Sequence, residues 1–467
     1  MATTSKVSSI SPGANHSPAA GSSPLLPRDA SLAAAYERYL RLSELARLWN
    51  SRDFPQWRSE SVLKPAIQAL EITFRLISIE LSDPRPYANH REWSRRLESL
   101  AALEIEIIGN LCEEDGGGGA PVVDLRSSAG VLARDRSSQE VWQLPGGAGA
   151  VVSRSSEESL LPRLAAWEKS KNIAGKIQFQ IESRMQGSPF TLGLGEPNLA
   201  GKPILEYDLV VRPSDLHSLK KTPFENLNNH ENQKLFNIHQ ILESWLASAK
   251  ELTRRLVDRI DSSDWAAAAG DCWLLERIWK LLAEITDLHL LMDPDDLLRL
   301  RGQLALRTST GSEAFCFRSA ALREVTAASG KELKRRVPWV LGAEADPSGG
   351  PRLQEATMRL FHSRRRGDGG NPGRIQLLQA FQAVEAALKR FYYGYRQVLT
   401  AAMGSLEATE CRPLAVSPES GDSLSQMFLE PAYFPSLDAA KTFLGELWQN
   451  EHRRSSSGRS DGRCGTR

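Results

Sequence analysis

The 467-residue sequence lacks the patterns that mark several common classes of protein. Its five cysteines are scattered and include no Cys-x-x-Cys pair, so we expect neither a disulfide framework nor a structural zinc site. These cysteines are Cys112, Cys272, Cys316, Cys411 and Cys464. No apolar run approaches the roughly eighteen residues that a membrane-spanning helix needs, so no membrane association of that kind is expected.

The chain also has little excess of charge of one sign. Its 58 Lys and Arg residues nearly balance 57 Asp and Glu residues, which leaves a net charge of +1. Nucleic-acid-binding surfaces typically need a basic excess, so no nucleic-acid partner is expected. The low cysteine content is typical of a reducing compartment, and we predict a cytoplasmic protein.

The N-terminal stretch lacks the apolar core of a secretory signal. Because it is rich in Pro, Gly and Ser, we expect residues 1–30 to form a disordered leader. Residues 1–28 are also rich in Ser and Ala and contain no acidic residue, as in transit peptides. Import into the plastid is therefore the alternative to a cytoplasmic location.

The most informative pattern in the sequence is helical periodicity between residues 228 and 304. Apolar residues recur there at intervals of three and four, which is the spacing of one helix face. A short break with capping residues at 262–264 separates two long runs, so we expect an antiparallel pair of helices. Asp293 and Pro294 predict the start of a third helix.

No convincing β-strand is found, and the predicted fold class is all-α, with many helices. Further helices are expected over residues 31–49, 62–81, 92–112, 157–185, 314–340, 352–364, 375–403 and 436–448. We expect two helical domains, at 31–190 and 191–450, and a disordered tail at 451–467. A Gly-rich, low-complexity insertion interrupts the first domain at 113–156.

The helical pair carries many polar side chains for a core element. They are His230, Glu231, His239, Gln240, Glu243 and Trp245, with Arg301 on the next helix. The spacings required for di-iron, zinc-hydrolase and serine-hydrolase sites are missing, so none of these is expected. Two interpretations of His239 stay open. It is either a buried imidazole that Glu243 or a backbone group satisfies, or an imidazole that binds or deprotonates a ligand N–H. Arg301 is similarly either an ion-paired helix arginine or a clamp for a carboxylate.

Long strings of the sequence resemble the plant nematode-resistance proteins of the HSPRO-like family. They include AAAYERYLRLSELARLWNSRDFPQWRSE, LKPAIQALEITFRLI, DPRPYANHREWSRRLESL, TLGLGEPNLAGKP, NHENQKLFNIHQILESW, LLERIWKLLAEITDLHLLMDPDD, AFCFRS and DPSGGPRLQEATMRLF. The resemblance implies a non-catalytic, cytoplasmic regulator of defence and stress responses that acts through protein–protein contacts. It also implies an SNF-related energy-sensing kinase complex as a partner, which no residue pattern indicates independently.

The C-terminal half is more distantly similar to the haem enzyme tryptophan dioxygenase. The string from His230 to Trp245 is similar to the enzyme's His-Asp-Glu…His-Gln-x-x-Glu-Leu-Trp helix, and a following Pro…Arg segment ends at Arg301. This resemblance implies a helical bundle like that of the tryptophan/indoleamine dioxygenases. It implies a ligand pocket formed by His239, Glu243, Trp245 and Arg301, in which His239 faces the indole N–H and Arg301 the carboxylate.

The chain departs from the dioxygenase where haem would bind. Tyr395 occupies the position of the enzyme's iron-ligating histidine, and a tyrosinate ligand favours ferric iron over ferrous oxygen binding. The enzyme's Gly-Thr-Gly-Gly loop is replaced by SLEATECRPLAVSPESGDS, and Leu235 stands where an aromatic residue would line the pocket. We therefore predict no cofactor and no dioxygenase reaction. The alternative is a sensor or divergent dioxygenase-like enzyme that binds an indole ligand, or haem at Tyr395.

Overall fold

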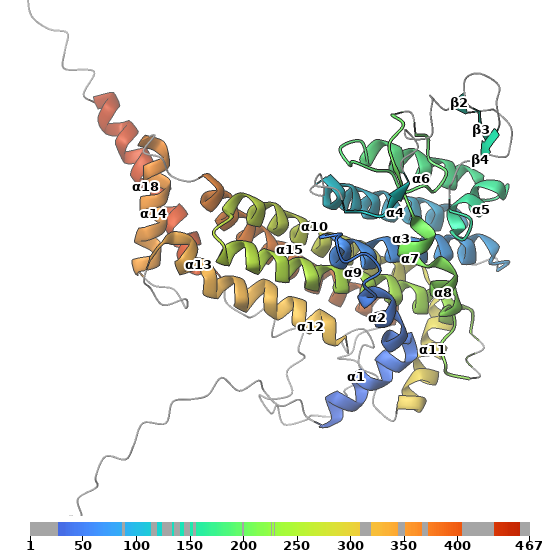
Figure 1. Cartoon of the computed structure of the whole chain (residues 1–467). Coiled ribbons are helices and arrows are strands. Elements are labelled where there is room, and N and C mark those ends of the chain that lie inside the picture. Colours follow the sequence, from blue (N-terminus) through green and yellow to red (C-terminus); the bar gives the residue numbers. More distant parts are fainter. Residues whose placement is uncertain are drawn as a thin grey trace, which may run out of the picture.

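The fold is built from helices, which confirms the predicted all-α class (Figure 1). The computed structural model describes residues 27–85, 89–113, 119–123, 133–134, 141–143, 150–152, 156–198, 200–225, 227, 229–308, 319–343, 351–366, 372–403 and 434–457. Helices α3 to α6 gather at one end, the long helices α9, α10 and α15 cross the middle, and α13, α14 and α18 form the other end (Figure 1). Among the described residues, no helix is long and apolar enough to cross a membrane.

The first expected helix is in fact two helices, α1 (Pro27–Leu40) and α2 (Leu42–Asn50). Arg41 separates them with a left-handed backbone at φ 58°, and a right-handed helix cannot continue through that conformation. The break lets α1 direct Tyr36 and Tyr39 into the core. Helix α1 starts inside the stretch predicted as a leader, and residues 1–26 of that prediction lie outside the described residues.

Helix α3 (Glu60–Ser82) lies at the centre of the N-terminal half and is buried on nearly all sides. Its buried face packs against α9, and α4 (His90–Glu113) lies beside it. The helix expected over 157–185 is also divided, into α5 (Leu160–Ala166) and α6 (Lys171–Arg184). The Ser159 side chain caps α5 by accepting a hydrogen bond from the Leu161 N–H.

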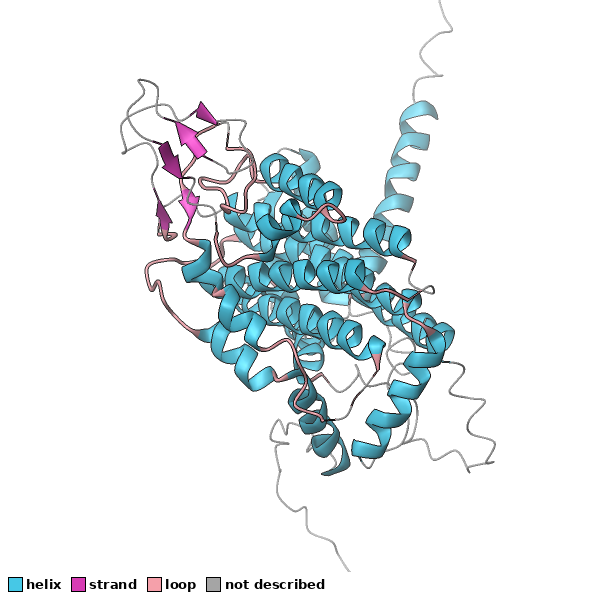
Figure 2. Cartoon of the chain, turned by 90° about the vertical axis from the view of Figure 1, so that its right-hand side faces the viewer, coloured by secondary structure: helices cyan, strands magenta, loops and turns pink. Residues whose placement is uncertain are grey.

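Short strands correct the expectation that the chain has none. Strand β1 (Val122–Val123) pairs antiparallel with β5 (Ile204–Leu205), and this pairing ties the start of the insertion to the chain that follows α6. A second sheet contains β2 (Ala133–Arg134), β3 (Val141–Gln143) and β4 (Ala150–Val152) (Figure 2). Two short helices, α7 (Tyr207–Val211) and α8 (Pro213–Ser218), then lead toward the central pair.

The predicted antiparallel pair is α9 (His230–Asp261) and α10 (Trp265–Asp287). The Asn229 side chain caps α9 by accepting from the Glu231 N–H, and the Asp264 side chain caps α10 by accepting from the Ala267 N–H. A 3₁₀ turn, η1 (Leu288–Leu291), and α11 (Pro294–Thr308) follow. Helix α15 (Pro372–Met403) packs along α10, so three long helices form the middle layer (Figures 1 and 2).

The remaining helices follow α11 in the sequence; α12 packs against α9, and α13, α14 and α18 form one end of the fold (Figure 1). These helices are α12 (Ala320–Ala327), the π-helical turn η3 (Ala328–Glu332), α13 (Leu333–Leu341), α14 (Pro351–Arg366) and α18 (Pro435–Ser457). Within η3, the buried Ser329 hydroxyl accepts a hydrogen bond from the Trp279 indole at 3.2 Å. Helix α18 runs into the stretch predicted as a disordered tail, and residues 458–467 of that prediction lie outside the described residues.

Candidate functional site

His239 lies in a buried cluster of polar side chains from three separate elements. Its Nδ1 lies 3.1 Å from the Tyr36 hydroxyl of α1, and its Nε2 lies 3.2 Å from Nε2 of His289 in η1. The His289 Nδ1 lies 2.7 Å from the Thr286 carbonyl oxygen. We call Tyr36, His239, Glu243 and His289 the imidazole cluster.

The tautomers of the two histidines follow from these contacts. Burial lowers the pKa of His239 well below its ordinary value, with a further contribution from His289, and burial also lowers the pKa of His289. Both rings are therefore neutral at pH 7. A carbonyl oxygen only accepts, so His289 carries its proton on Nδ1 and its Nε2 accepts from the Nε2–H of His239. The His239 Nδ1 is then an acceptor for the Tyr36 hydroxyl.

Glu243 completes the chain of hydrogen bonds at the Tyr36 end. Its Oε1 lies 2.9 Å from the Tyr36 hydroxyl. Burial raises the pKa of Glu243 to about 7, although hydrogen bonds from Ser319 and Tyr36 act in the opposite direction. A protonated Glu243 can donate to Tyr36 while Tyr36 donates to His239. An ionised Glu243 competes with His239 for the single hydroxyl hydrogen of Tyr36.

Tyr395 lies close to His289. Its ring is buried, stacks on Phe391 of the same helix at 5.8 Å between centroids, and lies 6.5 Å from the His289 ring. The structure thus brings the predicted haem-ligand position into the same buried region as His239. Aromatic rings and imidazoles fill the space between the described helices at this point.

Trp245 is fully buried but belongs to a different contact. Its indole N–H donates to Glu104 Oε1 of α4 at 2.8 Å. Burial raises the pKa of Glu104 to about 8, against hydrogen bonds from Trp245 and Thr73 that lower it. Trp245 therefore joins α9 to α4, rather than His239 to a ligand pocket.

Arg301 belongs to α11, and the structure describes its backbone but not its side chain. Of the four predicted pocket residues, His239 and Glu243 meet through Tyr36, and Trp245 lies with Glu104. The described part of the chain contains no group of three or more His, Cys, Asp or Glu side chains placed to hold a metal ion.

Two polar clusters were not predicted from the sequence. In one, Arg75 of α3 donates to Asn237 at 2.6 Å, to Gln240 at 2.5 Å and to the Leu216 carbonyl oxygen at 3.1 Å. Burial lowers the pKa of Arg75 to about 9, although the charge of Glu71 raises it. The only signal in the sequence was a charged residue within the apolar run of α3, which does not identify its partners.

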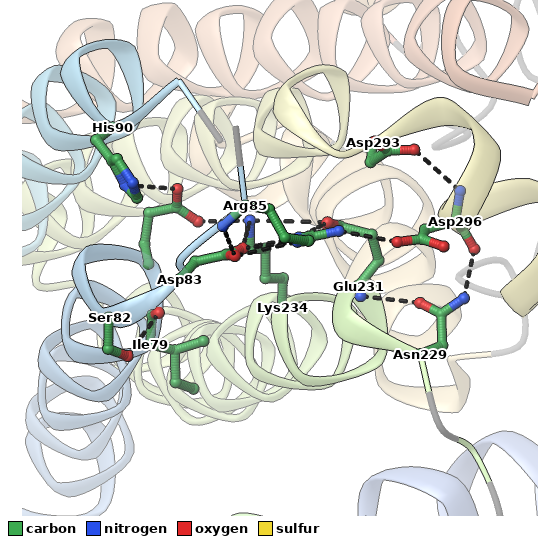
Figure 3. Close-up of polar contacts among 11 residues, drawn as sticks. Ile79, Ser82, Asp83, Arg85, His90, Asn229, Glu231, Lys234, Asp293 and Asp296 are labelled. Carbon is green, nitrogen blue, oxygen red and sulfur yellow. Dashed lines mark hydrogen bonds and ion pairs between the residues drawn. The ribbon is translucent and has the colours of Figure 1, made fainter. Parts of the chain in front are cut away.

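The second cluster joins the end of α3 to the first turns of α9 and α11 (Figure 3). Lys234 lies 2.6 Å from Glu80 and 3.2 Å from Asp83, and its ammonium stands 5.0 Å from the centroid of the Trp93 ring. Arg85 contacts Asp83, Glu231 and Asp296 (Figure 3). We call Glu80, Asp83, Arg85, Glu231, Lys234 and Asp296 the ion-pair cluster.

The charges of the ion-pair cluster are strongly coupled to one another. Burial raises the pKa of Glu80, even though Lys234 favours its charged form. The pKa of Asp83 is lowered despite its burial, because Arg85 and Lys234 donate hydrogen bonds to it. The pKa of Arg85 is raised, chiefly by its hydrogen bond to Asp83. Removing one cation would leave a buried carboxylate without compensation.

Together, these features define an all-helical protein whose core is crossed by buried polar clusters that link distant parts of the chain.

Comparison with known proteins identifies the family. The family models of the Hs1pro-1 N-terminus and the Hs1pro-1 protein C-terminus match residues 1–182 and 185–450. The chain therefore belongs to the Hs1pro-1 family. It is 49% identical to nematode resistance protein-like HSPRO2 of Arabidopsis thaliana over 430 residues, which cover 92% of this chain and 91% of that protein. It is 47% identical to nematode resistance protein-like HSPRO1 of the same plant over 428 residues, or 91% of this chain and 93% of that protein.

Proposed function

We propose that this protein is a non-catalytic regulator of plant defence or stress responses that works in the cytoplasm through contacts with other proteins. The observation that carries this proposal is that His239, Glu243 and Trp245 bind other side chains of the same chain. Similarity to the nematode resistance protein-like relatives supports the biological role. An SNF-related energy-sensing kinase complex is the partner that we propose.

A rigid core with aromatic side chains on the surface suits such a role. The imidazole and ion-pair clusters connect helices that are far apart in the sequence, so they fix the shape of the surface. Phe179, Trp339 and Tyr393 are 62%, 56% and 57% exposed. Exposed aromatic residues often anchor protein–protein contacts.

The test combines a binding assay with a resistance assay. Purified protein and recombinant kinase complex are mixed, and complex formation is measured by isothermal titration calorimetry. Plants that express wild-type protein, Tyr395→Phe, or Trp339→Ser with Tyr393→Ser are then challenged with nematodes. We expect Tyr395→Phe to act as wild type, and the surface variant to lose partner binding and resistance. Loss of resistance in a folded Tyr395→Phe protein would contradict the proposal.

A haem- or indole-binding sensor is the second candidate, because His239 and Tyr395 both lie next to His289. The contacts of Tyr395 with Phe391 and His289 do not fit a haem group unless the cluster rearranges, so we derive no step through haem. Haemin is titrated into wild-type protein and Tyr395→Phe while absorption is recorded. A saturable Soret shift that only wild type shows would favour this candidate, and non-saturating binding, equal in both, would exclude haem.

A further inference from the structure

A groove of about 710 Å³ opens beside the ion-pair cluster. The end of α3 forms one wall and the first two turns of α9 form another. The rim is formed by Lys220, Lys221, Thr222, Phe224 and Leu227. Figure 3 shows residues of two walls, namely Ile79, Ser82 and Asp83 from the end of α3, and Asn229 and Lys234 at the start of α9. The volume is in the range of about 300–1,000 Å³ that is typical of ligand sites.

The charges that line this groove are unevenly compensated. Of the ion-pair cluster, only Asp83 and Lys234 line the groove, and their charged groups lie 3.2 Å apart. Lys220 and Lys221 are exposed on the rim, and no carboxylate of the described chain pairs with them. The residues that line the groove therefore carry more lysines (Lys220, Lys221 and Lys234) than carboxylates (Asp83).

Aromatic side chains form part of the apolar lining of the groove, together with Ile79, Pro84 and Leu227. Phe236 is buried at its base, and Phe224 is half-buried in the rim. The Tyr39 ring lies between them, 5.8 Å from Phe224 and 5.7 Å from Phe236. The Tyr39 hydroxyl donates to Asn232 at 2.8 Å, and the Arg38 guanidinium stands 5.0 Å from the centre of the Phe224 ring. These contacts fix the aromatic base in place and add a cation beside it.

We propose that this groove binds an acidic peptide segment of a partner protein. Carboxylates of the peptide meet Lys220 and Lys221, and one apolar side chain of the peptide packs on the partly exposed Phe224 and Leu227. Charge complementarity selects the acidic sequence, and these two side chains supply apolar contact area. A lipid surface fits less well, because the flat face of a membrane cannot enter a groove between α3 and α9. The inference rests on the proposed function, since it assigns a place for the protein–protein contact.

A pool of fluorescein-labelled nine-residue peptides tests the proposal, each with four Glu residues and one Phe, Trp or Leu residue. A matched pool has Lys in place of Glu. Binding to the full-length protein is measured by fluorescence anisotropy at two salt concentrations. We expect saturable binding of the acidic pool only, and weaker binding at high salt. The double variant Lys220→Glu with Lys221→Glu should weaken binding by on the order of tenfold.

A matched control distinguishes an effect of the groove lysines on binding from an effect of the net charge of the protein. Lys171→Glu with Lys331→Glu changes the net charge equally, at exposed lysines of α6 and η3 outside the groove. This control should bind the acidic pool as wild type does. Phe224→Ala should weaken binding of the pool while leaving its salt dependence unchanged. Circular dichroism confirms that each variant is folded.

Several outcomes would overturn the groove proposal. One is the absence of saturable binding of the acidic peptides. Another is an equal loss of binding in the Lys171→Glu, Lys331→Glu control. A third is complete displacement of the peptides by inorganic phosphate at the same concentration as the peptide. Preferential binding to vesicles of anionic phospholipid would identify a membrane-facing surface instead. If the protein binds the kinase complex equally well with and without the Lys220→Glu and Lys221→Glu changes, the groove proposal fails while the proposed function stands.

Discussion

His239 and His289 face each other through their Nε2 atoms at 3.2 Å, although fifty residues separate them in the sequence. One nitrogen must carry a hydrogen and the other must not, so the pair imposes a direction on the whole chain of hydrogen bonds from Glu243 to Thr286. The imidazole cluster thereby acts as one unit that joins α1, α9 and η1.

Replacement of His289 by Leu should destabilise the protein by about 1–3 kcal/mol. The Nε2–H of His239 would lose its acceptor in a buried setting, and burying an unsatisfied donor costs about that much. Urea unfolding at pH 7 measures the effect. His230→Leu, at an exposed position on the same helix as His239, should change stability by less than about 0.5 kcal/mol. Equal stability of His289→Leu and wild type would show that the imidazole contact contributes nothing.

Glu243→Gln should change the pH dependence of stability. The pKa of Glu243 is about 7 in the folded protein and near 4.5 in the unfolded chain, so the folded state binds more protons between these values. Its contribution to stability is complete below pH 4.5 and is lost as the pH rises through 7. Glutamine does not titrate, so the free energy of unfolding of the variant relative to wild type should rise from pH 5 to pH 8. A constant difference would contradict the raised pKa.

For Glu104→Gln, the free energy of unfolding relative to wild type should also rise with pH, and the rise should extend to a higher pH than for Glu243→Gln. Burial places the pKa of Glu104 near 8, and glutamine keeps an oxygen that can accept from the Trp245 indole. We expect the variant to gain roughly 1–3 kcal/mol relative to wild type between pH 6 and pH 9. Glu106→Gln on the same helix, which removes partly exposed ion pairs with Arg184 and Arg277, is the control. A similar pH-dependent gain in that control would rule out a specific role of burial.

Lys234→Met should be strongly destabilising, by about 3–5 kcal/mol. It leaves the buried carboxylates Glu80 and Glu231 without their shared cation, and breaking a buried pair on one side costs about this much. Lys250→Met breaks the exposed pair with Glu324 and should cost less than about 1 kcal/mol. Chemical denaturation of both variants makes the comparison. Equal losses of stability in the two variants would mean that the buried ion pairs contribute no more to stability than the exposed pair.

The sequence predicted the elements whose signals are local. Apolar spacing predicted α9 and α10, and Asn229 and Asp264 cap them through hydrogen bonds to residues within three positions. The break at Arg41 was missed, because apolar spacing continues across it and the kink depends on how α1 packs against α9. Local pattern carries no information about such packing.

The site was predictable only in part, for a similar reason. The polar residues of α9 stood out in the apolar pattern, and His239 was singled out from them. Its partner Tyr36 lies 203 residues away, and Glu243 contacts that same tyrosine. The sequence alone suggested a contact between His239 and Glu243 at one helical turn, whereas the structure places the Tyr36 hydroxyl within reach of both. Pairings over such distances need the fold.

The buried polar residues of α3 have a consequence for synthesis of the protein on the ribosome. Four buried polar side chains of α3 have partners beyond residue 200. Gln68 contacts the Val211 carbonyl oxygen, and Glu71 contacts Tyr207 and His217. Arg75 contacts Asn237 and Gln240, and Glu80 contacts Lys234. While only the N-terminal half has emerged, these groups must stay hydrated, so α3 cannot settle into its final surroundings. We therefore expect the two segments that the family models separate to fold together, and an N-terminal fragment released early to be sensitive to proteolysis.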